Sequence, residues 1–386
     1  MAHLLLAVIY ISFIALGLPD SLLGNGWPAM HQDFGVPLSY AGIVSTIIAL
    51  GTIVSSLMSD RLTKRFGAGK ITATSIAMTA AGLLAFCFSG EFWQICLWAI
   101  PYGLGAGGVD AALNNYMALH YESHHMSWLH SMWGIGATTG PFIMGWALAG
   151  PYSWRLGYFT IGVVQVVIVI LLFWSLPLWK QRQVNTKVEV TKSLSFRQVL
   201  SIKGAKEIMV AFFCYCALEQ TTGLWAASFL VIKGGLPEEM ASRFAGLFFL
   251  GITIGRMISG FLTFKLSDTQ MIRLGITIVF IGLAAILLPF GGWVTIVGLM
   301  LLGLGCAPIY PSIIHSIPAF FGEDKSQAVM GIQMAGAYVG LCVMPPLFGP
   351  IANHISVALL PVYLLAIAIV MAVSHERLQK ITQKTS

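Results

Sequence analysis

Three acidic residues stand inside long apolar stretches of the sequence: Asp20, Asp110 and Glu219. An ionised side chain at the centre of a lipid bilayer costs about 2.5–3.5 kcal/mol on insertion scales, so such residues persist mainly where they face a cavity or a partner. A carboxyl group in that setting can take up and release a proton, or bind another cation. We therefore expect Asp110 to be a coupling site, Asp20 a second coupling or solute-contacting acid, and Glu219 a third candidate. The alternative for each is a structural hydrogen bond.

Amide, imidazole and aromatic side chains accompany these acids and could bind a polar solute. Asn114 follows Asp110 by four residues, so the two share one face if the segment is helical. Amides and hydroxyls hydrogen-bond sugar hydroxyls, and rings cover the apolar face of a sugar. The alternative for each is a helix–helix contact or a place in the aromatic belt of the membrane. The candidate solute-binding residues are Asn114, Asn115, His130, Trp133, Gln220, Trp225, Tyr310, Gln333 and Tyr338.

The remaining chemistry-bearing residues indicate no reaction centre. The sequence has no nucleotide-binding loop, nucleophile elbow or zinc spacing, so we expect no enzyme, no cofactor and no metal site. Arg256 is the one basic residue inside an apolar stretch. It lies about 12 Å from the end of that stretch at the helical rise, within reach of the membrane interface, so we favour a structural role for it.

The elements that must position these residues are membrane-spanning helices. The chain is 57% hydrophobic and 9% charged, where a soluble domain carries roughly 25% charged residues. A bilayer core needs about 20 apolar residues per helix. Apolar stretches of that length predict twelve spans: 4–28, 38–59, 70–89, 92–118, 128–149, 156–176, 207–232, 242–264, 270–289, 293–316, 327–349 and 356–374.

Basic residues between the spans predict the topology. With the N-terminus in the cytoplasm, 17 of the 21 Lys and Arg residues fall on the cytoplasmic side and three fall outside. This bias is the positive-inside rule, so both termini are expected in the cytoplasm. The net charge of +6 then reflects the membrane topology and does not indicate a surface that binds nucleic acid. One long polar connection, 177–206, separates a first six-helix half (1–176) from a second (207–386).

The two halves also resemble each other. Gly103 and Gly105 recur as Gly303 and Gly305, 200 residues later, as do Gly136 and Gly140 as Gly336 and Gly340. Gly42 and Gly51 match Gly246 and Gly255 at an offset of 204. Repeated six-helix halves related by an axis along the membrane normal place a solute site near the midplane between them. The expected fold class is therefore an all-α integral membrane protein with twelve transmembrane helices in two pseudo-symmetric six-helix bundles.

Two motifs carry a resemblance to a known family. The segment Ser59-Asp60-Arg61-Leu62-Thr63-Lys64-Arg65 resembles the helix 2–3 loop signature of the major facilitator superfamily, and the likeness in organisation covers the whole chain. Asp110-Ala111-Ala112-Leu113-Asn114-Asn115 resembles the helix 4 stretch of the fucose–proton symporter family within it, with Asp in place of Glu and Asn115 in place of Pro. We expect Asp60, Arg61 and Arg65 of the first motif to form a cytoplasmic charge lock that stabilises one state and breaks in the other. The alternative is that they are only a topology signal, and both can be true.

The resemblance implies cation-coupled transport. We expect proton-coupled uptake of a sugar or similar small polar solute by alternating access, by a monomer in the cytoplasmic (inner) membrane. A sodium-coupled version would use the same acids. Two alternatives are proton-driven efflux of an amphipathic drug or metabolite, and a membrane receptor on the same fold that transports nothing.

Overall fold

The structure of the chain is a computed structural model that describes residues 2–121, 123–179, 196–288 and 292–383. These residues are almost entirely helical, and none of them forms a strand. In the N-terminal half the helices are α1 (Ala2–Asp20), α2 (Leu22–Asp33), the short 3-10 helix η1 (Leu38–Tyr40), α3 (Ala41–Phe66), α4 (Ala68–Phe88), α5 (Phe92–His120), α6 (Ser123–Leu148) and α7 (Ser153–Trp179).

The C-terminal half repeats this plan. Its helices are α8 (Phe196–Leu200), α9 (Ala205–Ile232), α10 (Glu238–Leu262), α11 (Asp268–Leu287), α12 (Gly292–Phe321), α13 (Glu323–Ile351), the short π-helix η3 (Ala352–Ser356), the short 3-10 helix η4 (Val357–Leu359), and α14 (Leu360–Gln383). Residues 180–195 of the predicted connection 177–206 lie outside the described part of the chain.

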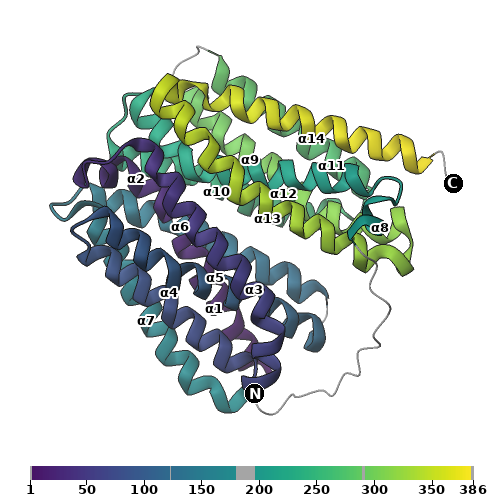
Figure 1. Cartoon of the computed structure of the whole chain (residues 1–386), viewed down its shortest axis with the longest axis horizontal. Coiled ribbons are helices and arrows are strands. Elements are labelled where there is room, and N and C mark those ends of the chain that lie inside the picture. Colours follow the sequence, from purple (N-terminus) through teal and green to yellow (C-terminus); the bar gives the residue numbers. More distant parts are fainter. Residues whose placement is uncertain (1, 122, 180–195, 289–291, 384–386) are drawn as a thin grey trace.

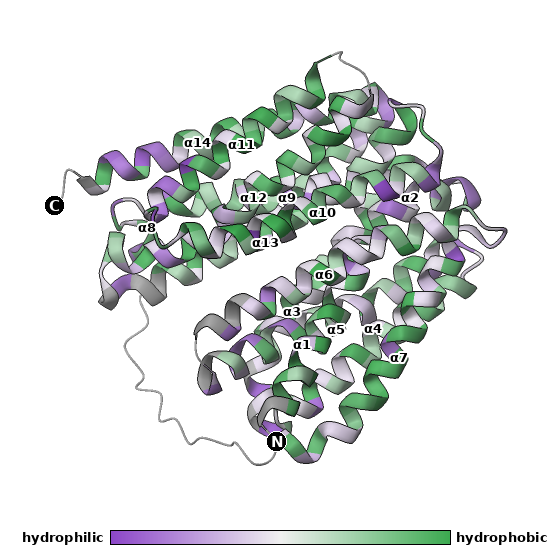
Figure 2. Cartoon of the chain, turned by 180° about the vertical axis from the view of Figure 1, so that it is seen from behind, coloured by the Kyte–Doolittle hydropathy of each residue, from purple (hydrophilic) through white to green (hydrophobic). Residues whose placement is uncertain are grey.

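The helices have the length and composition of membrane spans. Among the described residues, nine stretches are long and apolar enough to cross a bilayer, and one of them, Val329–Thr382, is long enough for two passes. The more polar helices α6 and α9 fall outside that set. Figure 2 shows hydrophobic residues along the bodies of the helices and hydrophilic ones gathered towards their ends. The all-α membrane fold is therefore confirmed, and the helices agree with the twelve predicted spans.

The first predicted span, 4–28, is interrupted in the structure. Helix α1 ends at Asp20, and α2 continues from Leu22 to Asp33. Pro19 has no backbone N–H, so the Ala15 carbonyl lacks its usual helical donor. The Gln165 side chain supplies that donor at 2.7 Å, and the Tyr102 hydroxyl donates to the Pro19 carbonyl at 3.0 Å. Side chains of α5 and α7 thus stabilise a broken helix beside Asp20.

The predicted helix 2–3 loop motif is also helical. Ser59 to Arg65 lie in the last turns of α3, which ends at Phe66. Nothing between Ser59 and Phe66 breaks a helix, whereas Gly67 has φ +86, a left-handed conformation that glycine adopts without strain. The turn between α3 and α4 is therefore at Gly67.

Two helical bundles form the molecule. In Figure 1 the N-terminal half, from α1 to α7, lies beside the C-terminal half, from α9 to α14. Within the first bundle α4 and α3 pack on α5, and α6 packs on α1; within the second α11 and α10 pack on α12, and α13 packs on α9. Contacts between the bundles join α6 to α10, α3 to α13 and α2 to α9.

The repeated glycines make equivalent contacts in both bundles. A Cβ at Gly103 would collide with the Ile48 carbonyl of α3, and one at Gly303 with the Phe248 carbonyl of α10. Gly140 likewise packs against a carbonyl of α1, and Gly340 against one of α9. Small residues permit such close helix approach in membranes. The repeated glycines thus make corresponding helix–backbone contacts in the two bundles, as the predicted pseudo-symmetry requires.

The bundles meet at one end and diverge at the other. Both views show the ribbons in contact near α2 and separated towards the two termini (Figures 1 and 2). At the joined end the Gln32 amide donates to Glu238 at 3.3 Å, and the Ser242 hydroxyl donates to the Pro141 carbonyl at 2.9 Å. The joined end is thus sealed by contacts between α2 and α10 and between α6 and α10.

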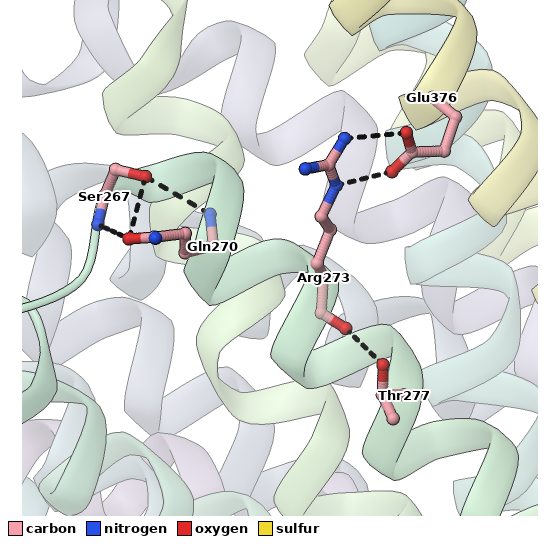
Figure 3. A network of polar contacts seen from close by, with 5 residues as sticks. All are labelled: Ser267, Gln270, Arg273, Thr277 and Glu376. Carbon is pink, nitrogen blue, oxygen red and sulfur yellow. Dashed lines mark hydrogen bonds and ion pairs between the residues drawn. The ribbon is translucent and has the colours of Figure 1, made fainter.

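A polar network holds the C-terminal bundle near the end that carries the termini. Arg273 of α11 forms a two-pronged ion pair with Glu376 of α14, at 2.7 and 2.8 Å (Figure 3). On the same helix Ser267 caps the first turn by accepting from the Gln270 backbone N–H at 3.4 Å. Exposed pairs of this kind contribute roughly 0–1 kcal/mol each, so the network fixes the placement of α11 on α14 more than it stabilises the fold.

Candidate functional site

One cavity of about 320 Å³ lies between the two bundles. That volume is within the range of about 300–1,000 Å³ that small-molecule sites occupy. Both halves of the chain contribute to its wall, which is partly polar. The predicted site residues that line it are Asp20, Asp110, His130 and Trp133 from the first bundle and Glu219, Gln220, Tyr310 and Tyr338 from the second.

Asp20 ends α1 at the break in the first span. Its Oδ2 accepts a hydrogen bond of 2.6 Å from the Trp133 Nε1 of α6. The face of the Trp133 ring contacts the second bundle. The Arg256 guanidinium carbon of α10 lies 4.8 Å from the centre of that ring. A carboxylate, an indole and a guanidinium thus follow one another across the boundary between the bundles.

Asp110 lies in the middle of α5. Its Oδ1 accepts a hydrogen bond of 2.9 Å from the Asn114 Nδ2, and that nitrogen also donates to the Asp110 carbonyl at 3.0 Å. The predicted sharing of one helix face is therefore realised as a direct contact. Asn114 is not itself part of the cavity wall, so it orients the carboxyl group from behind.

Glu219 and Gln220 are adjacent on α9 and face the cavity from the opposite side. Glu219 is 9% exposed, whereas Gln220 is open to solvent. Asp110 and Glu219 are both near enough to act electrostatically on Asp20. The cavity therefore brings together acids that are distant in sequence, two from the first bundle and one from the second.

Rings cover much of the remaining wall. His130 packs edge-on against Phe13 with their centres 5.8 Å apart. Tyr310 lies 5.0 Å from Phe212 and 5.8 Å from Tyr215, centre to centre. Tyr338 joins the same wall from α13. This combination of rings and acids suits a small solute that presents both apolar faces and hydroxyl groups.

Three further predicted solute-binding residues, in addition to Asn114, lie outside the cavity wall. Asn115 is exposed on the outside of α5. Trp225 is fully buried, and its Nε1 donates to the Pro345 carbonyl at 2.8 Å. Gln333 is fully buried on α13, and its amide oxygen and nitrogen have no hydrogen-bond partner among the described residues.

The proposed lock residues lie at the end of α3 nearest the termini. Arg61 and Arg65 are exposed, and the Arg65 guanidinium lies 5.1 Å from the Phe66 ring centre. The side chain of Asp60 is outside what the structure describes. The lock therefore remains a prediction.

Sequence reasoning left several wall residues out of the site. Arg256, assigned a structural role, lines the cavity together with Tyr102, Thr52 and Tyr215. The sequence feature that could have placed Arg256 in the site is that it is a single cation within an apolar stretch. Tyr102 and Thr52 gave none, because hydroxyl residues are common in membrane helices and only packing decides which face a cavity.

No group of three or more His, Cys, Asp or Glu side chains close enough to hold a metal ion occurs in the described ranges. The six cysteines are unpaired and lie within helices. The wall of the cavity therefore offers carboxyl, amide, hydroxyl and aromatic groups together with one guanidinium.

Two helical bundles that enclose a polar cavity inside a membrane protein are the architecture of a secondary transporter. A family model described as Major Facilitator Superfamily matches residues 9–345. The chain therefore belongs to the major facilitator superfamily, and it is a transporter and not an enzyme. The predicted family membership is confirmed.

Individual relatives are distant. The chain is 20% identical over 360 residues to the glucose/mannose transporter GlcP of Bacillus subtilis (strain 168), covering 91% of this chain and 88% of that protein. It is 21% identical over 426 residues to a gallate transporter of Pseudomonas putida, covering 97% and 92%. It spans only 57% of the length of another curated relative.

Solved structures support the fold. A bacterial homologue of the human lysosomal transporter Spinster, in an inward-facing and occupied conformation, superposes with a TM-score of 0.76. The alignment covers 99% of this chain and 97% of that one, at 10% sequence identity. At that identity the likeness concerns the arrangement of helices alone.

Proposed function

We propose that this transporter carries a sugar or similar small polar solute into the cell, coupled to the entry of protons. The observation that supports it most is the convergence of Asp20, Asp110 and Glu219 on one cavity between the bundles. A carboxyl group that faces such a cavity can be protonated in one orientation and release the proton in the other. The similarity to a glucose/mannose transporter agrees with a sugar as the solute.

Alternating access follows from the arrangement of the bundles. The bundles contact each other where α2 meets α9 and α10, and they diverge towards the termini. With both termini in the cytoplasm of an inner-membrane protein, as the basic residues favour, this is the inward-open state. Rocking of one bundle against the other would close that end and open the joined one, and the lock of Asp60, Arg61 and Arg65 would stabilise one of the two states.

The test is uptake of radiolabelled hexoses into proteoliposomes under an imposed proton gradient. We expect Asp110→Asn to reduce gradient-driven uptake by about two orders of magnitude or more, since the amide cannot carry the proton. Glu91→Gln, an acid-to-amide change at the exposed start of the same helix α5, is the matched control and should keep most of the uptake. Hexose uptake that Asp110→Asn leaves unchanged would remove the coupling role from α5.

The same experiment separates the alternatives. Uptake driven by a sodium gradient alone would show that the coupling ion at these carboxyl groups is sodium and not a proton. No hexose uptake under either gradient would exclude a neutral hexose as the solute; if charged or aromatic solutes are not taken up either, drug or metabolite efflux or a receptor role becomes the leading alternative.

A further inference from the structure

Arg256 is a cation in the cavity to which the described part of the chain gives no acidic partner. No ion pair or hydrogen bond of its guanidinium occurs among the described residues, and its contact is with the ring of Trp133 at 4.8 Å. A cation–π contact engages the face of the guanidinium plane. The five N–H donors lie in that plane, so they remain available.

Two of the three carboxyl groups in the cavity already have donors of their own, and the third, Glu219, forms no ion pair with Arg256 in the described part of the chain. Asp20 accepts from the Trp133 Nε1 at 2.6 Å, and Asp110 accepts from the Asn114 Nδ2 at 2.9 Å. A guanidinium inside a membrane protein is costly unless it is paired and hydrogen-bonded. Its fork of donors matches a carboxylate in two-pronged geometry better than it matches a hydroxyl group. Among the described residues the wall therefore contains a guanidinium that can bind an anion and is paired with no carboxylate.

The space in front of Arg256 suits a solute of one ring. The cavity measures about 320 Å³, and its wall carries the rings of Phe13, Tyr102, Phe249 and Tyr310. Rings of this kind cover the faces of a planar aromatic ring or of a pyranose. Amide and carboxyl groups such as those of Gln220 and Asp110 can then bind hydroxyl substituents at the rim.

We propose that Arg256 binds the carboxylate of the solute, and that the solute is a hydroxylated single-ring monocarboxylate, either a sugar acid or a hydroxyaromatic acid. This inference rests on the proposed function, because it takes the cavity to be the path of the solute. It also gives proton coupling an electrostatic reason. Protonation of Asp20 or Asp110 removes negative charge from the wall and so favours entry of an anion.

The experiment measures binding to the purified full-length protein in nanodiscs by titration calorimetry. The probes are gallate with its neutral counterpart pyrogallol, and glucuronate with its neutral counterpart glucose. We expect at least one carboxylate to bind about tenfold or more tightly than its counterpart, a difference typical of one charge-assisted hydrogen-bonded contact. The pair that shows the difference identifies the aromatic or the sugar acid.

Variants then assign that difference to Arg256. Arg256→Gln should abolish the preference for the carboxylate, and Arg256→Lys should keep part of it, because a charge remains without the fork. Arg243→Gln is the matched control, an exposed arginine on the same helix α10, and should behave like the unaltered protein. Thermal unfolding of each variant establishes that it is folded before its binding is compared.

Two results overturn the inference: no binding of either carboxylate by the unaltered protein, or a carboxylate preference that Arg256→Gln leaves in place. Its failure differs from failure of the proposed function. Gradient-driven glucose uptake that Arg256→Gln does not alter would keep the proposed function and reject the anion site. Carboxylate binding that depends on Arg256, without any gradient-driven uptake, would keep the site and reject proton-coupled uptake.

Discussion

Trp133 contacts both halves of the candidate site, one through its ring nitrogen and the other through the face of its ring. The indole Nε1 donates to Asp20 of the first bundle, and the ring face meets Arg256 of the second. One side chain therefore connects a coupling candidate to the cation across the bundle boundary. A change of protonation at Asp20 would alter the acceptor of that bond and so the position of the ring under Arg256.

Trp133→Phe separates the two contacts at this residue. Phenylalanine keeps a ring face for Arg256 and removes the donor to Asp20, and a hydrogen bond to a charged group contributes about 1.5–3 kcal/mol. We expect gradient-driven uptake to fall about tenfold or more with little change in thermal stability, because Asp20 stays open to water.

The matched control is Trp174→Phe, which alters a tryptophan that is 77% exposed on α7. Its uptake should equal that of the unaltered protein. Equal uptake by Trp133→Phe would show that the bond to Asp20 has no part in transport.

At the scale of elements, the joined end depends on close contact between α2 and α9. A Cβ at Gly24 would lie 2.8 Å from the Leu224 Cα and would also collide with the Gly223 carbonyl. Backbone on the far side cannot move aside without moving the helix. Glycine at this position therefore permits the seal, and the break of the first span at Ser21 gives α2 the direction that brings it there.

Gly24→Val should force this seal apart. Overpacking costs about 1–3 kcal/mol, which shifts a two-state equilibrium about 5- to 150-fold. We expect the population open at the joined end to rise. Spin labels at Gln32 and Glu238, whose side chains meet across the bundles at 3.3 Å, would report longer distances in a background without native cysteines.

Gly260→Val adds the same atoms on α10, where nothing lies within 4 Å of an added Cβ. It should leave the label distances unchanged. Unchanged distances in Gly24→Val as well would mean that the contact of α2 with α9 does not control the seal.

At the scale of the whole molecule, the divergence of the bundles predicts that the cavity opens towards the termini. The bundles diverge towards the termini, and Thr52 belongs to the cavity wall. A water-soluble reagent should therefore reach Thr52 from the side that carries the C-terminus. Which side of the membrane this is follows from the prediction that both termini are cytoplasmic.

Labelling of Thr52→Cys with a membrane-impermeant maleimide tests both points, again in a background without native cysteines. We expect reaction in inside-out vesicles at least about tenfold faster than in right-side-out vesicles. Lys380→Cys, exposed near the C-terminus, reports which side the termini occupy. Labelling of the two positions from opposite sides would show that the dominant state is open at the other end.

The sequence alone predicts the membrane class, the repeat and the family, because each rests on local or additive properties. Apolar length predicts spans whatever their neighbours are, and the recurrence of Gly103 and Gly105 as Gly303 and Gly305 reflects packing demands that both bundles share. Isolated charges in apolar stretches likewise stand out without a structure, which is why Asp20, Asp110 and Glu219 could be selected as candidates.

Only the tertiary structure decides which side chains face one another across the bundles. Asn114 contacts Asp110 as helical spacing predicts, but Trp225 and Gln333 are buried within the protein, and Arg256 faces the cavity instead of the interface. The direction in which a side chain points depends on how its helix is rotated about the helix axis. Packing against every neighbouring helix sets that rotation. The sequence by itself therefore determines that this protein spans a membrane, that its two halves repeat and that it belongs to a transporter family. The packing of the two bundles determines its cavity and the residues that line it.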